Sequence, residues 1–310
     1  MLEKVLHQTE AVDSLRKTIS GQNKTPLLLV GPSGVGKKYS VLCAAKEMVD
    51  QDDSQVYCLD RGIHPDFKII SPEKNVLRVD DVRTALEWSS FRPKTSPLKM
   101  AVFDGIDCAS PATANSLLKT LEEPPDYVRF FLLAESASDV LPTIVSRCRL
   151  VNYRKLPLQL IVDTLKEFTD DVDKAHLCAV LSEGSIGQAI DILNSGKLML
   201  RDQVWHLISS ALNRDFVAVH TAIDAMAADL SLTFRFLEHA LHDIAMYEYK
   251  PSLIMNSDKV MVAEKLSSTL SKDRQLQLRS GLRDLQSRQS SSLNHAFHLK
   301  TLISTVFGAF

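Results

Sequence analysis

A glycine-rich octapeptide near the N-terminus has the composition and spacing of a phosphate-binding loop. It consists of Gly31-Pro32-Ser33-Gly34-Val35-Gly36-Lys37-Lys38 and lies between a short apolar run and a helical pattern. Glycines let backbone N–H groups converge on phosphate oxygens, and Lys37 would reach the terminal phosphates. A working loop continues with Ser or Thr, whose hydroxyl holds Mg²⁺. Here that residue is Lys38, an ammonium that cannot ligate a metal. We therefore expect a phosphate loop by origin that is poorly suited to hydrolysis. The alternative is a glycine-rich turn of no functional meaning.

A second candidate is the carboxylate that ends the run Lys99-Met100-Ala101-Val102-Phe103-Asp104. In open α/β sheets the carboxyl ends of the strands border the ligand crevice, so Asp104 could hold Mg²⁺ through water. Gly105 follows and supplies no carboxylate. Asp107 lies two residues further on and is either its substitute or a solvated turn residue.

Short apolar runs alternate with helical patterns through the first half of the chain. Ser110 with Pro111 predicts a helix start and Pro124-Pro125 its stop, while Asp80 or Asp81 would cap the helix around Val82. The strands are expected at residues 26–31, 68–70, 100–104, 130–134 and 150–153. This alternation predicts a parallel five-stranded sheet flanked by helices on both faces.

After about Leu156 the apolar spacing becomes helical, with Gly184 and Gly196 as breaks. From Met199 onward only helices are expected, interrupted weakly at Pro251 and at Ser290-Ser291-Ser292. A length of 310 residues also favours two or three domains. We therefore predict an α/β domain at residues 1–155, a small helical domain at 156–198 and an all-α domain at 199–310.

The bulk composition excludes several classes of protein. Lys and Arg number 36 against 38 Asp and Glu, a net charge of −2, so any DNA contact must come from a local patch. Because no run approaches about 18 apolar residues, we expect no transmembrane helix. The N-terminus lacks the pattern of a secretory signal. The five cysteines are scattered, which indicates reduced thiols in a cytoplasm: Cys43, Cys58, Cys108, Cys148 and Cys178.

One long string points to a family. Residues 114–125, Ala-Asn-Ser-Leu-Leu-Lys-Thr-Leu-Glu-Glu-Pro-Pro, followed by Ser146-Arg147-Cys148, resemble the bacterial clamp-loader subunits gamma/tau and delta prime of DNA polymerase III. The resemblance extends to His64-Pro65-Asp66, to Ser71-Pro72-Glu73-Lys74 and to residues 293–299. Without the family, the leucines would be a helix face and the Glu and Pro pairs its end. The resemblance implies an AAA+ domain, a helical lid and a collar that joins subunits.

The resemblance also gives Arg147 a role. In this family the arginine projects toward the γ-phosphate bound by the adjacent subunit, and a planar guanidinium suits a transferring phosphoryl group. Such arginine fingers contribute roughly 10³–10⁵ in rate. The alternative is an ordinary surface arginine.

Four departures from the family point toward an inactive ATP site. Lys38 replaces the metal-binding hydroxyl, and Gly105 replaces the catalytic Glu of AAA+ ATPases. Glu135 stands at the first sensor position, where Ser136 could substitute, and Gly187 stands where motor subunits carry a sensor Arg. Because all of these groups act on the same developing charge, efficient turnover is not expected. ATP and Mg²⁺ would bind weakly at most.

Relatives also carry four cysteines in a zinc module before the His-Pro-Asp segment, whereas only Cys58 lies there. One thiolate cannot hold a tetrahedral zinc, so no zinc is expected. Arg78, Arg83, Arg92, Lys94 and Lys99 cluster loosely, but a solvated face explains each of them equally well, and no DNA site follows.

The function implied is that of a delta-prime-like stator in the DNA polymerase III holoenzyme, which offers Arg147 to a neighbour and has no ATPase of its own. Its partners would be gamma/tau-like and delta-like subunits in a hetero-pentamer, the sliding clamp, and primer-template DNA through the assembled complex, at the cytoplasmic replisome and without a membrane. Three alternatives remain: a gamma/tau-like motor using Lys37, Asp104 and Asp107 or Glu135, a protein that binds ATP without hydrolysis, and an unrelated nucleotide kinase.

Overall fold

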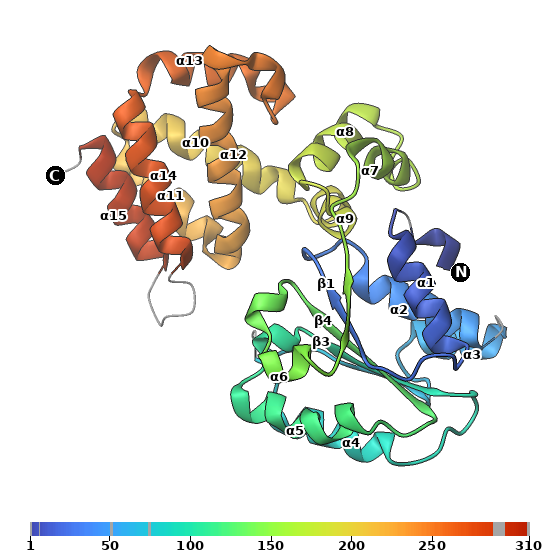
Figure 1. The fold of residues 1–310 in the computed structure, drawn as a ribbon. Helices are drawn as coiled ribbons and strands as arrows, with labels where there is room; N and C mark the ends of the chain where they lie inside the picture. Colours follow the sequence, from blue (N-terminus) through green and yellow to red (C-terminus); the bar gives the residue numbers. More distant parts are fainter. Residues whose placement is uncertain (1, 6, 50–51, 74–75, 288–294, 309–310) are drawn as a thin grey trace. The chain divides into compact units, whose positions relative to one another are not determined.

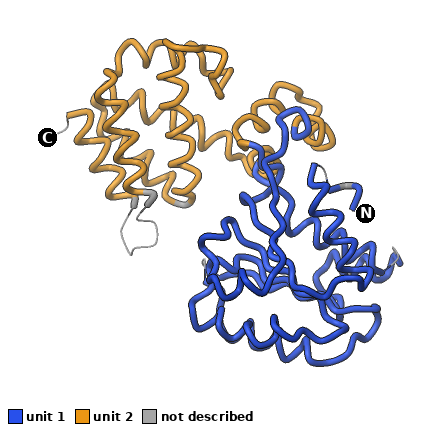
Figure 2. Tube along the Cα trace, in the orientation of Figure 1, with its two compact units in different colours: residues 1–161, 184–188 blue, residues 162–183, 189–310 orange. Residues whose placement is uncertain are grey.

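A computed structural model describes residues 2–5, 7–49, 52–73, 76–287 and 295–308. Lys74, the Ser290–Ser292 break and the Leu293-Asn294 pair of the C-terminal motif lie outside the described residues. The chain divides into two compact units, one made of residues 1–161 and 184–188 and the other of 162–183 and 189–310 (Figure 2). The predicted boundary between a lid and a collar at residues 198 and 199 stays a prediction.

The first unit is built on a sheet of five parallel strands in the order β2-β3-β4-β1-β5. Strands β1, β3 and β4 are labelled in Figure 1. The strands are β1 (Leu27–Val30), β2 (Phe67–Ile70), β3 (Lys99–Asp104), β4 (Val128–Ala134) and β5 (Arg149–Asn152). The central strands β1, β3 and β4 are buried along almost their whole length, as parallel strands covered on both faces must be. The predicted sheet is confirmed.

Helices cover both faces because successive residues of each strand point to opposite sides. Leu27, Leu29 and Val102 pack in a cluster with α1 (Thr9–Ile19), α2 (Lys37–Met48) and α3 (Asp53–Asp60). Leu28 and Phe103 pack on the other face with α4 (Val79–Ser89), α5 (Pro111–Glu122) and α6 (Pro142–Val145). Each face of the sheet therefore has its own hydrophobic core.

The local signals at helix ends were only partly right. Ser110 caps α5, and its side chain accepts the N–H of Thr113, with Pro111 in the first turn as predicted. The predicted cap of α4 was wrong, because Arg78 occupies the N-cap position without a side-chain bond, and Asp80 and Asp81 lie in the first turn. There their charges face the positive end of the helix dipole.

Beyond Asn152 the described residues contain helices and no strands, as expected. The helices are α7 (Leu158–Leu165), α8 (Val172–Leu181), α9 (Ile186–Asn194), α10 (Lys197–Leu212), α11 (Phe216–Met226), α12 (Leu230–Tyr249), α13 (Val260–Thr269), α14 (Lys272–Ser287) and α15 (His295–Phe307). Short 3₁₀ turns occur at Leu2–Lys4, Ile106–Cys108, Ala137–Asp139, Ala227–Asp229, Pro251–Leu253 and Ser257–Lys259. Among the described helices none is long and apolar enough to cross a membrane.

Candidate functional site

The phosphate loop joins the carboxyl end of β1 to the N-terminus of α2. The N–H of Gly31 donates to Ala134 O at the end of β4, at 3.2 Å, and α2 begins at Lys37 after Gly36. Gly34 and Gly36 have φ angles of 72° and 100°, which disfavour any side chain. At Gly31 a Cβ would stand 2.5 Å from the carbonyl oxygen of Tyr153. The loop thus has the strand–turn–helix context that its sequence predicted.

The ammonium of Lys37 folds back onto its own loop. Nζ donates to the carbonyl oxygens of Gly31 and Pro32, the latter at 2.9 Å. Burial lowers the pKa of Lys37, while the nearby carboxylates of Glu135, Asp107 and Asp104 act in the opposite direction. Lys37 therefore lies against its own loop, close to Asp104 at the end of β3 and to Asp107 and Glu135, which follow β3 and β4.

Lys38 pairs with the carboxylate that would hold a metal. Its Nζ lies 3.2 Å from Asp104 Oδ2 and 3.3 Å from Ser71 Oγ, and Ser71 Oγ is itself 3.4 Å from Asp104 Oδ2. The sequence identified both residues but did not predict their pairing. The spacing of 66 positions carries no signal, because the pair forms only when β1 and β3 are assembled in one sheet.

The position at which the resemblance leads us to expect a catalytic Glu has a backbone conformation and surroundings that favour glycine. Gly105 adopts a left-handed conformation at φ 70°, and a Cβ there would approach Pro72 Cγ at 3.1 Å. Asp107 Oδ2 accepts the backbone N–H of Glu135 at 2.8 Å, so its carboxylate stabilises the turn after β4. Ser136, the other candidate at this sensor position, caps the short 3₁₀ turn that follows by accepting the N–H of Ser138.

The second sensor segment packs directly against the phosphate loop within the same unit. Ser185 Oγ donates to Ser33 O at 2.9 Å, and Gly187 N donates to Gly34 O at 2.9 Å. A Cβ at Gly187 would lie only 3.0 Å from Gly34 Cα. Gly187, expected from the sequence resemblance to stand at a sensor position, is thus a residue whose lack of a side chain allows close contact between the two backbones.

Arg147 lies at the edge of the sheet formed by the amino ends of the strands, whereas the phosphate loop lies at the opposite edge, formed by their carboxyl ends. It precedes β5, whose first residue Arg149 pairs with Leu27 at the start of β1, whereas the loop follows the last residue of β1. Four residues of strand separate the two edges, which corresponds to about 10 Å or more at ~3.3 Å per residue. Arg147 is therefore not placed to act on a phosphate in its own loop.

The guanidinium of Arg147 is held by three groups of the chain. Nε donates to Glu122 Oε1 at 2.7 Å, Nη2 contacts the same oxygen, and Nη1 donates to Thr143 O at 2.8 Å. Nη1 also lies 3.4 Å from Ser146 Oγ. Glu122 is the last residue of α5 and belongs to the Glu-Glu-Pro-Pro string. The sequence singled out this string and Arg147 separately and did not predict that Glu122 binds Arg147.

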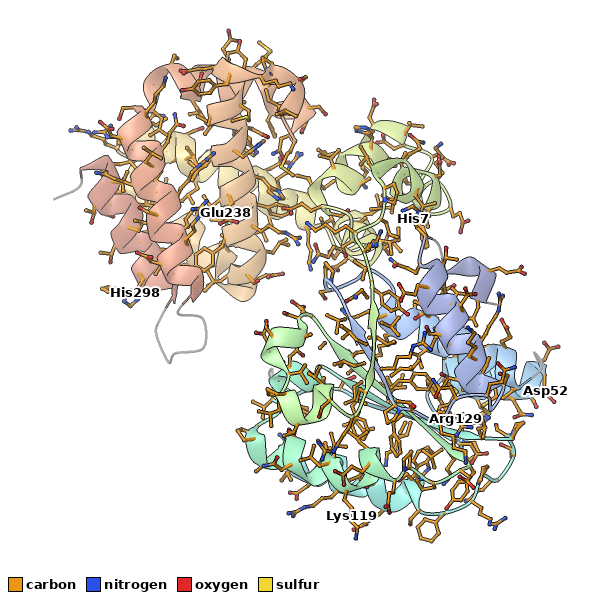
Figure 3. All side chains as sticks on the ribbon, viewed as in Figure 1. His7, Asp52, Lys119, Arg129, Glu238 and His298 are labelled. Atoms are coloured by element: carbon orange, nitrogen blue, oxygen red, sulfur yellow. The ribbon has the colours of Figure 1, made fainter. Side chains whose placement is uncertain are left out.

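A second arginine near the same edge has a structural role. Arg129, labelled in Figure 3, is buried in β4 and donates to the carbonyls of Thr18, Asp126 and Val128 at 2.8–3.0 Å. Burial lowers the pKa of this guanidinium. Lys99, one of the loosely clustered basic residues, is likewise only 3% exposed and donates to Trp88 O. Lys99 is therefore unavailable to DNA.

The His-Pro-Asp segment is structural. Asp66 is fully buried, and its carboxylate accepts the backbone N–H groups of Lys94, Thr95 and Ser96 at 2.7–3.0 Å. Within the described part of the chain, no three His, Cys, Asp or Glu side chains group closely enough to hold a metal.

Comparisons with known proteins agree with this architecture. Residues 7–157 match the family described as "DNA polymerase III, delta subunit". The chain is 30% identical to DNA polymerase III subunit delta' of Escherichia coli over 217 residues, which cover 69% of this chain and 64% of that protein. It is 25% identical to a replication factor C small subunit of Methanococcus vannielii over 248 residues, covering 76% and 73%. With replication factor C subunit 4 of Homo sapiens it shares 26% identity over 201 residues, covering 63% and 55%.

Among solved structures, a DNA polymerase III gamma subunit-related protein from Thermotoga maritima superposes with a TM-score of 0.54 at 16% identity, covering 96% of this chain and 98% of the other. At that identity the likeness shows the fold. It confirms the expected AAA+ domain with a helical C-terminal region. The sequence matches support the AAA+ clamp-loader family for this chain.

Proposed function

We propose that this chain is a delta-prime-like stator of a clamp loader, which supplies Arg147 to a neighbour's ATP site and turns over no ATP itself. The observation that carries the proposal is the placement of Arg147 at the sheet edge opposite the chain's own phosphate loop. A guanidinium that is oriented by its own chain but distant from its own loop is suited to a phosphate bound by another subunit.

Held in this way, Arg147 keeps a usable edge. A guanidinium carries five N–H donors in a plane. Glu122 accepts from Nε and from Nη2, and Thr143 O accepts from Nη1. One further N–H on Nη2 is left for other acceptors, and the second N–H of Nη1 makes only the long 3.4 Å contact with Ser146 Oγ. Those two donors form the outer edge that can meet two oxygens of a phosphoryl group. In this proposal Glu122 positions the arginine finger.

The residues of the chain's own phosphate site that depart from the family support the proposal that this site does not hydrolyse ATP. Lys38 pairs with Asp104, the catalytic Glu position is the left-handed Gly105, and the sensor position is Gly187 in backbone contact with Gly34. Each of these features is built into the local packing. A single side-chain change would therefore not restore a working site.

The proposal extends to the remaining domains and to the partners. Residues 156–198 would form the lid and residues 199–310 a collar that joins the chain to gamma/tau-like and delta-like subunits in a hetero-pentamer. The assembly would act on a sliding clamp and on primer-template DNA at the cytoplasmic replisome. The sequence similarity to DNA polymerase III subunit delta' and to replication factor C subunits supports these partners.

A motor subunit of the gamma/tau type is the second candidate. It is favoured by the retention of Lys37 against the loop and of Asp104 at the end of β3. In that case mutation of Lys37 would abolish the ATPase activity, and mutation of Arg147 would have a smaller effect.

The deciding experiment measures the clamp- and primed-DNA-stimulated ATPase of the reconstituted loader with wild-type, Lys37→Ala or Arg147→Ala chains. The stator predicts a collapse with Arg147→Ala, by about 10³-fold, and no change with Lys37→Ala. The opposite pattern would identify a motor. Arg83→Ala is the control, because it removes an exposed arginine.

A further inference from the structure

Lys38, Asp104 and Ser71 form a triangle of polar contacts at the carboxyl ends of the strands, and the proposed role of Arg147 does not account for it. The ammonium lies within 3.3 Å of both oxygens, and the two oxygens are 3.4 Å apart. Lys38 occupies the sequence position whose hydroxyl would ligate a divalent cation. Asp104 is the carboxylate that the same cation would use. One side chain therefore removes a ligand and also takes the place of the ion.

Magnesium requires near-ideal octahedral geometry, with oxygen ligands at about 2.0–2.1 Å, and keeps several waters. An ammonium 3.2 Å from Asp104 Oδ2 stands in the region that such an ion and its waters would fill. It also repels a second cation at that distance. The donor set at this position thus does not fit a divalent metal.

The charges around the loop lead to the same conclusion. Three carboxylates, those of Asp104, Asp107 and Glu135, are close enough to act on Lys37. Lys38 adds a second ammonium beside Asp104. Three negative groups therefore face two positive ones. Without Lys38 they would face one, and the surplus of two negative charges would favour a divalent ion.

We propose that the Lys38 ammonium is a built-in replacement for the divalent cation of this loop, which ties the first turn of α2 to β3 and to Ser71 without any metal. The Asp104 position then takes no Mg²⁺, and it would become a metal site if residue 38 carried a hydroxyl. This inference concerns the chain's own loop and holds whether or not Arg147 acts on a neighbour.

The test uses Mn²⁺ as the probe and electron paramagnetic resonance of the full-length chain, titrated with MnCl₂ alone and with MnCl₂ plus ADP. The wild type should show no Mn²⁺ binding that depends on Asp104. Lys38→Thr and Lys38→Ser should each gain one site, at least tenfold tighter than any binding by the wild type. Adding Asp104→Asn to either variant should abolish the new site.

Lys38→Met is the matched control, because it removes the charge and supplies no oxygen ligand. It should gain less Mn²⁺ affinity than Lys38→Thr. Circular dichroism melts establish that each variant is folded, and two hydroxyl variants guard against the failure of one. The proposal is overturned if the wild type binds a Mn²⁺ ion that Asp104→Asn removes. It is equally overturned if folded Lys38→Thr and Lys38→Ser chains both bind no Mn²⁺.

Discussion

Glu122 and Arg147 are joined side-on, with Nε and Nη2 of the guanidinium both donating to one carboxylate oxygen, Oε1. The two residues come from the end of α5 and from the turn after α6, 25 positions apart in the chain. This contact fixes the plane of the guanidinium. It also links the Glu-Glu-Pro-Pro string to the Ser-Arg-Cys motif, which the sequence presents as separate features.

We predict that Glu122→Gln lowers the loader's stimulated kcat about tenfold, which corresponds to about 1.4 kcal/mol of transition-state stabilisation. The amide can still accept one bond but loses the charge that orients Arg147. The KM for ATP should stay unchanged, because the finger acts on the transition state and does not bind the ground state. Steady-state ATPase assays of the reconstituted loader measure both constants.

Glu123→Gln is the matched control, since Glu123 is the exposed neighbour that ends the same helix. It should leave kcat at the wild-type value. Equal kcat values for Glu122→Gln and wild type would refute the positioning role while leaving the role of Arg147 itself open.

We predict that Arg147→Lys loses nearly as much activity as Arg147→Ala, within about tenfold of it. A single ammonium lacks the planar fork, so it cannot contact Glu122 and Thr143 O and also present two donors to a phosphoryl group. The same ATPase assay measures the loss. Activity of Arg147→Lys near the wild-type level would mean that charge alone suffices and that the held geometry is irrelevant.

Much of the α/β unit could be predicted from local signals. The apolar runs before Gly31 and Asp104 are continuous because parallel strands are buried on both faces, and Ser110 with Pro111 marks a helix start. The cap of α4 was misassigned, since Asp80 and Asp81 lie within the first turn of the helix and satisfy there the same electrostatic preference as a capping carboxylate.

The pairings at the candidate site could not be predicted in this way. Lys38 with Asp104, Arg147 with Glu122 and Gly187 with Gly34 each join segments that are distant in sequence. The first two pairings depend on how the sheet arranges the segments next to its strands, and the third depends on α9 packing against the phosphate loop. Lys99 is a further example: its charge predicts an exposed side chain, whereas it is buried at the start of β3 and lies against Trp88.

We predict that Gly187→Ala destabilises the chain by about 1 kcal/mol, because overpacking costs about 1–3 kcal/mol and a helical Gly→Ala change returns at most about 1. The new Cβ would stand 3.0 Å from Gly34 Cα and 3.2 Å from Gly34 O, both backbone atoms that cannot rotate away. Gly187→Arg should lose at least as much and gain no ATPase, since Lys38 and Gly105 remain. Urea unfolding of the full chain measures the loss of stability. Unchanged midpoints for both variants would mean that the contact between the two glycines yields readily.

Finally, we predict that Asp66→Asn destabilises the α/β unit by about 2–3 kcal/mol at neutral pH, the scale of hydrogen bonds to a charged group. Burial alone would raise the pKa of Asp66, but hydrogen bonds from Thr95, Lys94 and Ser96 outweigh it and lower the pKa. Because the folded-state pKa lies below the unfolded one, this stabilisation is complete above the unfolded pKa of about 4. It is lost as pH falls through the folded-state pKa.

The difference in unfolding free energy between wild type and Asp66→Asn should therefore be constant from about pH 5 to pH 7 and should narrow below about pH 4. Urea unfolding at a series of pH values measures it, with Asp53→Asn as the control because Asp53 is exposed at the start of α3. That control should differ little from wild type at any pH. If the difference in unfolding free energy between wild type and Asp66→Asn stays constant down to pH 3, the variant is destabilised by poorer packing of the amide and not by the loss of hydrogen bonds to a charged carboxylate. The His-Pro-Asp segment would then hold the 94–96 loop by packing.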